Sequence, residues 1–451
     1  MSTLFNGLDL SLKSVTAAFT LEDGKTAAKR MSFANNPEGV DVIADQVTST
    51  CSRLGLTQVE IGMEATGNLA FGLAQALRKY RFPDGLRVNV HLLNARQVAQ
   101  LKKLFGLESK TDPVDAGMIA EYLRFRRLDT PRVIDEQYLA LQMLTRHRYH
   151  LVCSLAAEKN RFISSLFLKF SGFRQHKPLS DTFGAAASTL LTEFLTVDEI
   201  AHLSINELAD FLQEKGKGGF NDPCAVASAI KEAAAKSYRL DARLVEPVNQ
   251  VLAMTLANVR YFERQIQEID KVIVRQLRAF AQDATILSSV PGFGPVFTAG
   301  LIAEIADIRR FDNDSALARY SAIAWKKTQS GEFTSDDTPM MRSGNQYLRY
   351  YFFEAANSLR LHNEEFGAYY QTKYREANSH HHKRACVLTA RKLVRLVFHL
   401  LHEGLLYKTP DQRKEYRAAH PLPEGTTSGE LARHIQRRRQ AKKAFRVHVD
   451  H

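Results

Sequence analysis

The sequence predicts an α/β domain over residues 1–130, followed by a mainly helical remainder. Two observations predict this division. In the first part, short apolar strands alternate with helices, and acidic residues stand where strands end. From about Asp135 onward, apolar residues recur at spacings of three, four and seven, which is the period of long helices. The 451 residues suffice for about three domains.

Composition favours a nucleic-acid partner and a reducing compartment. The chain has 61 Lys and Arg against 49 Asp and Glu, a net charge of +12 and a pI near 9.4. A globular protein this basic usually binds a polyanion. The four cysteines are scattered, which argues against a disulfide framework or a zinc site. Residues 1–6 lack the pattern of a signal peptide, and residues 393–401 are too short for a membrane span, so a cytoplasmic protein is expected.

The first domain is predicted to contain strands over residues 4–10, 15–21, 59–63 and 87–93, with helices over 69–80 and from Asn94. Two acids occupy unusual places in this pattern. Asp9 lies inside the first strand, where aspartate is depleted, and Glu64 stands at the exit of the third. A carboxylate at the end of a core strand needs hydrogen-bond partners or a cation.

A second pair of acids, Asp112 and Asp115, stands three residues apart at the start of a predicted helix with Pro113 in its first turn. Two interpretations fit the pair alone. Asp112 can be an N-cap with Asp115 as a first-turn acid, or both can hold a divalent metal. With Asp9 and Glu64, four carboxylates would repel one another strongly unless divalent cations neutralised them. The set therefore predicts a two-metal site for displacement at phosphorus.

The middle of the chain predicts an antiparallel helical hairpin for assembly or for spanning a ligand. Two apolar stripes, over residues 141–166 and 248–273, flank a small helical insert. Within that insert, Thr196 and Ser204 open helices with the capping-box pattern. Arg148 and Glu158 interrupt the first stripe, so a dimeric coiled coil and an intramolecular helix pair both remain possible.

Residues 287–301 predict a helix-hairpin-helix-like element: a helix ends, a Pro/Gly turn follows, and an apolar helix begins. The turn amides can bind a DNA phosphate, although such glycines also serve plain helix packing. Candidate nucleic-acid contacts are the turn glycines and the lysines that precede the acidic pair: Gly292, Gly294, Lys102, Lys103 and Lys110.

Ser330, followed by glycine, is a candidate nucleophile, because the cations Lys326, Lys327, Arg342 and Arg349 stand near it in sequence. A serine that attacks a phosphodiester needs cations or metals to meet the developing charge. An ordinary loop serine is the alternative. The basic tail over residues 406–451 is expected to be disordered or to fold on a polyanion.

These motifs together resemble the DEDD transposases of the IS110 insertion-sequence group, which are related to the Piv DNA invertase. The resemblance covers most of residues 4–405. It rests on these stretches, in this order: Gly7-Leu8-Asp9-Leu10-Ser11, Met63-Glu64-Ala65-Thr66-Gly67, Asn94-Ala95-Arg96-Gln97-Val98, Lys110-Thr111-Asp112-Pro113-Val114-Asp115-Ala116, Pro291-Gly292-Phe293-Gly294-Pro295, Gln329-Ser330-Gly331, Arg342-Ser343-Gly344-Asn345 and Ala390-Arg391-Lys392-Leu393.

The resemblance implies a RuvC-like (RNase H-like) N-terminal domain whose acids bind Mg²⁺, with two ions expected and Mn²⁺ as a substitute. The matching acids are Asp9, Glu64, Asp112 and Asp115. It also implies a mainly helical C-terminal transposase domain whose serine forms a covalent 5′-phosphoserine link with DNA, and the matching residue is Ser330. Trp325-Lys326-Lys327 replaces the family's usual Ala-Pro turn, which leaves Ser321 and Ser335 as alternatives.

Partners and domain limits follow from the same resemblance. Such recombinases act on donor and target double-stranded DNA and are often guided by a structured noncoding RNA. They are expected to form dimers that pair into tetramers through the coiled coil, with the metal site of one protomer serving the serine of another. The expected domains are residues 1–130 (RuvC-like), 131–280 (helical hairpin with insert), 281–405 (transposase domain) and 406–451 (basic tail).

Three alternatives remain: a Piv-type site-specific invertase, a junction-resolving endonuclease that uses the acids with water, and a non-catalytic nucleic-acid-binding protein. The long C-terminal half with Ser330 argues against simple hydrolysis, which needs no nucleophilic serine. The four ordered carboxylates in an α/β frame argue against a protein that only binds.

Overall fold

The structure is a computed structural model that describes residues 3–65, 69–105, 111–126, 135–325, 329–330, 333–334, 339–341 and 343–419. The chain forms two compact units, Met1–Asp135 and Glu136–His451. Among the residues described, no helix is long and apolar enough to cross a membrane. The expected separation of an α/β part from a helical part is confirmed.

The first unit is built on a mixed five-stranded sheet in the order β3-β2-β1-β4-β5. The strands β1, β4 and β5 run parallel, whereas β2 and β3 are antiparallel additions on one side. The strands are β1 (Thr3–Leu10), β2 (Ser14–Leu21), β3 (Thr26–Ala34), β4 (Gln58–Glu64) and β5 (Arg87–Leu93). The helices are α1 (Pro37–Leu54), α2 (Leu69–Lys79), α3 (Ala95–Leu104) and α4 (Asp112–Arg126).

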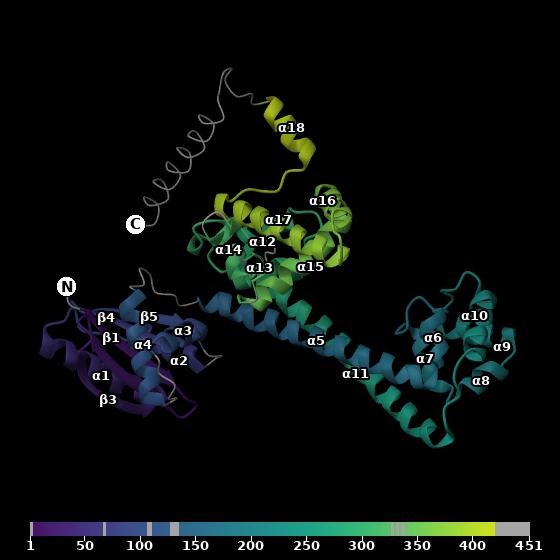
Figure 1. Ribbon diagram of the computed structural model, residues 1–451, viewed down its shortest axis with the longest axis horizontal. Helices are drawn as coiled ribbons and strands as arrows, with labels where there is room; N and C mark the ends of the chain where they lie inside the picture. Colours follow the sequence, from purple (N-terminus) through teal and green to yellow (C-terminus); the bar gives the residue numbers. More distant parts are fainter. Residues whose placement is uncertain are drawn as a thin grey trace. The chain divides into compact units, whose positions relative to one another are not determined.

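Helices pack on this sheet (Figure 1). Two separate apolar cores cover its two faces. The larger one packs α1 and α2 against β1, β2 and β4. The smaller one packs α4 and the start of α3 against Phe5 and Leu93. Because side chains alternate along a strand, β1 and β5 contribute to both cores, whereas the apolar side chains of β4 belong to the larger one.

The sequence pattern did not predict β3 or α1. The strand β3 lies at the sheet edge and is largely exposed, so its apolar alternation is weak. Local signals for α1 were present: the Asn36 side chain caps its first turn, Pro37 opens it, and Gly55 (φ 65°) ends it.

The second unit begins with a pair of long helices, α5 (Glu136–Lys169) and α11 (Ala242–Leu277), which pack along each other. Ion pairs join Arg148 to Asp270 (2.5 Å) and Lys159 to Glu263 (2.7 Å). Because the residue numbers rise on one helix as they fall on the other, the helices are antiparallel. The helical hairpin is therefore formed within one chain, and Arg148 contributes to it as an ion-pair partner.

The helical insert between α5 and α11 has its own apolar core. It consists of α6 (Ser171–His176), α7 (Ala185–Glu193), α8 (Val197–His202), α9 (Ile205–Lys215) and α10 (Pro223–Ala235). The predicted capping box at Ser204 and Glu207 is present. At the end of α5, the buried Lys169 donates hydrogen bonds to the carbonyl oxygens of Leu191 and Phe194, and burial lowers the pKa of its ammonium to about 8.

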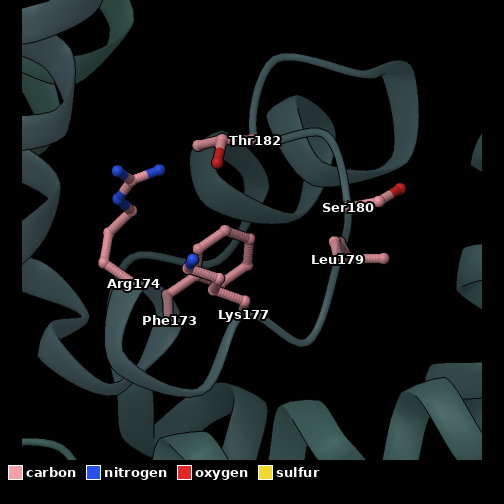
Figure 2. Close-up of a pocket in the computed structure, with 6 residues that line it drawn as sticks. All are labelled: Phe173, Arg174, Lys177, Leu179, Ser180 and Thr182. Atoms are coloured by element: carbon pink, nitrogen blue, oxygen red, sulfur yellow. The ribbon is translucent and has the colours of Figure 1, made fainter. Parts of the chain in front are cut away.

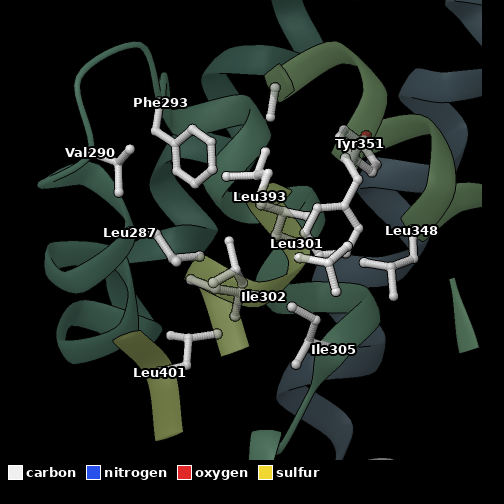
Figure 3. Packing of buried hydrophobic residues seen from close by; sticks show 14 of the residues in the cluster. Leu287, Val290, Phe293, Leu301, Ile302, Ile305, Leu348, Tyr351, Leu393 and Leu401 are labelled. Carbon is white, nitrogen blue, oxygen red and sulfur yellow. The ribbon is translucent and has the colours of Figure 1, made fainter. Parts of the chain in front are cut away.

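The C-terminal part packs around α13, an apolar helix whose residues from Thr298 to Ile305 are all buried. Figure 3 shows Leu301 and Ile305 of this helix beside Tyr351 and Leu393. The elements are η1 (Arg278–Phe280), α12 (Ala281–Ser288), α13 (Pro295–Ile305), η2 (Ile308–Arg310), α14 (Asp314–Tyr320), β6 (Gln329–Ser330), β7 (Phe333–Thr334), α15 (Gln346–His362), α16 (Glu364–Arg375), α17 (His381–Glu403) and α18 (Pro410–Ala419).

Gly7→Ala is expected to lower the free energy of unfolding of the first unit by about 3 kcal/mol, the upper range for overpacking. A Cβ at Gly7 would lie 2.1 Å from the carbonyl oxygen of Ala116 in α4, and a backbone atom cannot move aside locally. Urea unfolding followed by circular dichroism measures the loss. The control is Gly72→Ala in α2, where nothing lies within 4 Å and roughly 0.5–1 kcal/mol should be gained. Equal stabilities of the two variants would contradict the packing argument.

Candidate active site

Asp9 and Glu64 lie side by side at the ends of the adjacent parallel strands β1 and β4. Leu8 pairs with Met63, and the two acids are the next residue on each strand. Alternation along a strand places Asp9 on the same face as Gly7, and Glu64 on the same face as Gly62. Both glycines face α4, because a Cβ at either would collide with it. The two strand-end acids therefore point to the side of the sheet that α4 covers.

The first turn of α4 supplies Asp112 and Asp115. The carbonyl oxygen of Thr111 accepts the backbone N–H groups of Val114 (2.9 Å) and Asp115 (3.0 Å), so Thr111 occupies the N-cap position. The interpretation of Asp112 as the N-cap is therefore wrong, because Asp112 is already the first helical residue. Residues three apart share one side of a helix, which leaves both carboxylates on the same side of this first turn.

The charges of the two acids of α4 reach Asp9. Burial raises the pKa of Asp9, and the negative charges of Asp115 and Asp112 raise it further. The backbone N–H of Leu10 and the charge of Lys102 act in the opposite direction. Asp9 thus interacts with both acids of α4 and with one cation. A divalent ion at this place would relieve the repulsion.

Another buried acid on the same sheet face, Glu60, has a different environment. It accepts hydrogen bonds from Gln58 and Asn89 (2.8 Å each) and pairs with the buried His91. Burial alone would raise the pKa of Glu60, but these hydrogen bonds outweigh it and lower the pKa. The carboxylate of Glu60 therefore has hydrogen-bond partners within the protein, and it is not among the charges that raise the pKa of Asp9.

The donor set fits a divalent cation chemically, since carboxylate oxygens are the ligands that Mg²⁺ and Mn²⁺ prefer. The residues that would hold it are Asp9, Glu64, Asp112 and Asp115. As they stand, no three His, Cys, Asp or Glu side chains in the described part of the chain converge closely enough to hold a metal ion. Binding a metal ion therefore requires the carboxylates to move closer together, and Asp115 is engaged by Lys102, whose Nζ lies 2.5 Å from Oδ1.

Ser330 lies in a short hairpin in which β6 pairs with β7, Ser330 being opposite Phe333. Its side chain, together with Lys326, Lys327 and Arg342, lies outside the described residues, as does the alternative Ser335. The other alternative, Ser321, is fully buried, and its hydroxyl donates to the carbonyl oxygen of Ala318 (3.1 Å). Ser321 is therefore unsuited to attack a phosphodiester.

A buried ion pair anchors the segment that carries Ser330. Glu304, with no exposed surface, accepts two hydrogen bonds from Arg146 of α5 (2.6 and 2.8 Å) and one from Asn345 (2.7 Å). Asn345 caps α15 after the segment, and its backbone N–H donates to the carbonyl of Tyr320 before it (2.7 Å). The two ends of the segment are thus joined. The sequence alone does not predict this network, although a glutamate inside the apolar helix α13 is a signal of it.

The predicted nucleic-acid contacts have varied surroundings. Lys102 is directed at Asp115, Lys103 is exposed on the same helix, and Lys110 lies outside the described residues.

Gly292 (φ 98°) packs against α15 and accepts a hydrogen bond from Ser358, as plain helix packing requires. Gly294 faces open space at the start of α13. Arg349 is partly buried, and its charge acts on Tyr149.

A separate hollow of about 200 Å³ lies in the helical insert (Figure 2). Arg174, Lys177 and Thr182 face it, together with Phe173. None of the residues predicted to form a site lines this hollow.

The mixed sheet, its helices and the following helical part define an RNase H-like transposase, an enzyme that cleaves and transfers DNA. A sequence model of transposases, of the DEDD type and the IS110 group, matches residues 6–170, which include all four acids. A second model, described as transposase of the IS116/IS110/IS902 family, matches residues 284–371, which include Ser330. The chain belongs to this family of insertion-sequence transposases.

A relative supports the assignment over a longer span. The chain is 26% identical over 332 residues to the "Insertion element IS116 uncharacterized 44.8 kDa protein" of Streptomyces clavuligerus. The match covers 71% of this chain and 78% of that protein. The family predicted from the motifs is confirmed.

Asp9→Asn is expected to stabilise the protein in the absence of divalent ions by about 1 kcal/mol, since relief of repulsion at a functional site commonly gives a gain of this size. The amide removes the charge that Asp112 and Asp115 oppose. Mg²⁺ should then raise the melting temperature of the wild type more than that of the variant. Differential scanning fluorimetry with and without Mg²⁺ measures both effects. A variant less stable than the wild type without metal would show that the acids do not repel.

Arg146→Ala is expected to cost about 3 kcal/mol, because it leaves the carboxylate of Glu304 buried without its cation. Arg309→Ala is the matched control, since the Arg309–Asp307 pair lies at the surface and should contribute less than about 1 kcal/mol. Denaturant unfolding of both variants gives the comparison. Similar small losses in both would mean that the buried pair does not hold the serine segment.

Proposed function

We propose that this transposase cuts and rejoins DNA in a Mg²⁺-dependent reaction through a covalent 5′-phosphoserine intermediate, as part of the movement of an insertion sequence. The observation that supports the proposal is the placement of acids from two strand ends and one helix start on the α4 side of an RNase H-like sheet, where Asp112 and Asp115 raise the pKa of Asp9. Repulsion between neighbouring carboxylates favours the binding of a cation beside them.

Each group has a definite role in this proposal. Asp9, Glu64, Asp112 and Asp115 hold the ions, with two Mg²⁺ expected, and the bound ions supply stabilisation for charge on the phosphate. The hydroxyl of Ser330 gives up its proton and its oxygen bonds to phosphorus. The P–O3′ bond breaks, and the 3′ oxygen takes up a proton and leaves as a hydroxyl. One phosphoester bond replaces another, so the bond energy is kept for rejoining. Lys326, Lys327, Arg342 and Arg349 are proposed to bind the DNA backbone near the serine.

We also propose that the active assembly contains several copies of the chain. The outer surface of α11 exposes Val251, Met254 and Tyr261, which lie near one another along the helix. Exposed apolar side chains of this kind favour contact with another protein surface. Dimers that pair into tetramers would let the acids of one copy serve the serine of another, and a structured noncoding RNA would select donor and target DNA. The division of the chain into the four domains expected from its sequence is also part of this proposal.

A cleavage assay tests the proposal: the protein is incubated with Mg²⁺, the transcribed noncoding RNA of its element, and supercoiled donor and target DNA. A covalent protein–DNA adduct should appear in denaturing gels. Ser330→Ala should abolish the adduct, and Asp112→Ala should lower cleavage by about 10³-fold or more, because it removes a ligand of the proposed metal site. Ser321→Ala is the control, because this hydroxyl is buried, and it should leave the adduct intact.

Different outcomes separate the alternatives. An adduct that survives Ser330→Ala but not Ser335→Ala would move the nucleophile to Ser335. Free 5′-phosphate ends without an adduct would favour a junction-resolving endonuclease that uses water. Exchange between two inverted sites in one plasmid, without insertion elsewhere, would favour a Piv-type invertase.

A further inference from the structure

Lys102 is directed into the acidic set. Its Nζ lies 2.5 Å from Oδ1 of Asp115, and the two side chains are only 18% and 24% exposed. Of the two acids in the first turn of α4, Asp115 is thus held by a cation of the protein itself.

The position of Lys102 follows from its place on α3. Val98, one helical turn earlier, is buried in the core that α3 shares with α4. Residues four apart share one side of a helix, so Lys102 also lies on the side that faces α4. Lys103 is turned to solvent on the same helix.

The acids stand on one side of the sheet. Asp9 and Glu64 end adjacent strands on the side that α4 covers, and Asp112 and Asp115 lie three residues apart in the first turn of α4. Negative charges gathered in this way repel one another unless a cation stands among them. A lysine ammonium is a compact charge on a flexible stem, so it can pair with a carboxylate and leave it again without moving a helix.

We infer that Lys102 is a resident counter-cation of the acidic site: it neutralises Asp115 while no divalent ion is bound and is displaced when the ion binds. This inference deepens the proposed metal-dependent function and rests on it. Lys102 and the ion compete for one carboxylate. The protein therefore keeps its acidic site stable without metal, and the metal concentration needed to fill the site rises.

A purely structural ion pair between α3 and α4 is the competing explanation, and the two differ in one measurable property. Both predict that Lys102→Met lowers the stability of the metal-free protein. Only the explanation of Lys102 as a counter-cation predicts that the same variant binds metal more tightly, because the variant lacks the ammonium that competes with the ion for Asp115.

The test is a titration of the full-length protein with Mn²⁺ alone, followed by electron paramagnetic resonance of the unbound ion and repeated with Mg²⁺ by calorimetry. Lys102→Met is expected to bind roughly tenfold more tightly than the wild type, the scale of removing one nearby charge. Lys102→Gln, a polar neutral variant, should behave alike and replaces Lys102→Met if that variant does not fold. Lys103→Met, the control on the same helix, should match the wild type.

The results distinguish this inference from the proposed function. Saturable binding by the wild type with unchanged or weaker binding by both Lys102 variants would overturn the inference alone. No saturable binding by the wild type or by either variant would overturn the metal site, and the inference with it. Equal tightening by Lys103→Met would show a general charge effect and would likewise overturn the assignment of Lys102.

Discussion

The arrangement of the acidic site depends on one steric constraint, the close approach of α4 to β1 and β4. Gly7 and Gly62 make it possible, because a Cβ at either position would run into Ala116 or Leu123 of α4. Each glycine stands two residues before an acid on its own strand, so the surface that receives the helix also carries the acids. The first turn of α4 then adds its two acids to those of the strands, and a side chain at either glycine would move that turn away.

This packing brings several negatively charged side chains to one side of the sheet, and the protein retains the repulsion between them. The raised pKa of Asp9 records the repulsion, while Glu60 on the same face shows what full hydrogen bonding does to a buried carboxylate. The acids of this sheet face therefore differ: Glu60 is stabilised by hydrogen bonds from protein groups, whereas Asp9 lies among negative charges that a cation would neutralise. Repulsion of this kind is typical of functional sites, where residues that the reaction requires lower the stability of the fold. Lys102 offsets part of the cost through its pair with Asp115.

The sequence predicted what local patterns determine. Strand alternation located β1, β4 and β5, with acids at the ends of the first two, and helical periodicity located α5 and α11. The edge strand β3 was missed because it is mostly exposed, and the N-cap was misplaced by one residue because caps depend on backbone geometry. Contacts between distant residues could not be predicted. Lys102 was assigned to nucleic acid because its partner stands on another helix, and Arg146 and Glu304 are 158 residues apart.

The two candidate catalytic elements are thus held by different forces. Close packing at Gly7 and Gly62 fixes the strands and the helix that carry the acids, and such contact is insensitive to salt and pH. Asn345, at the end of the serine segment, is instead held by the buried carboxylate of Glu304, which also pairs with Arg146. Removing that cation would leave the charge buried without its partner. The first turns of α5 belong to the same frame, since Gln142 donates to the carbonyl of Ala303 (2.9 Å) and Tyr351 donates to that of Thr145 (2.8 Å). The helix that carries Arg146 is therefore bound to α13 and α15, and through Glu304 to Asn345 at the end of the serine segment.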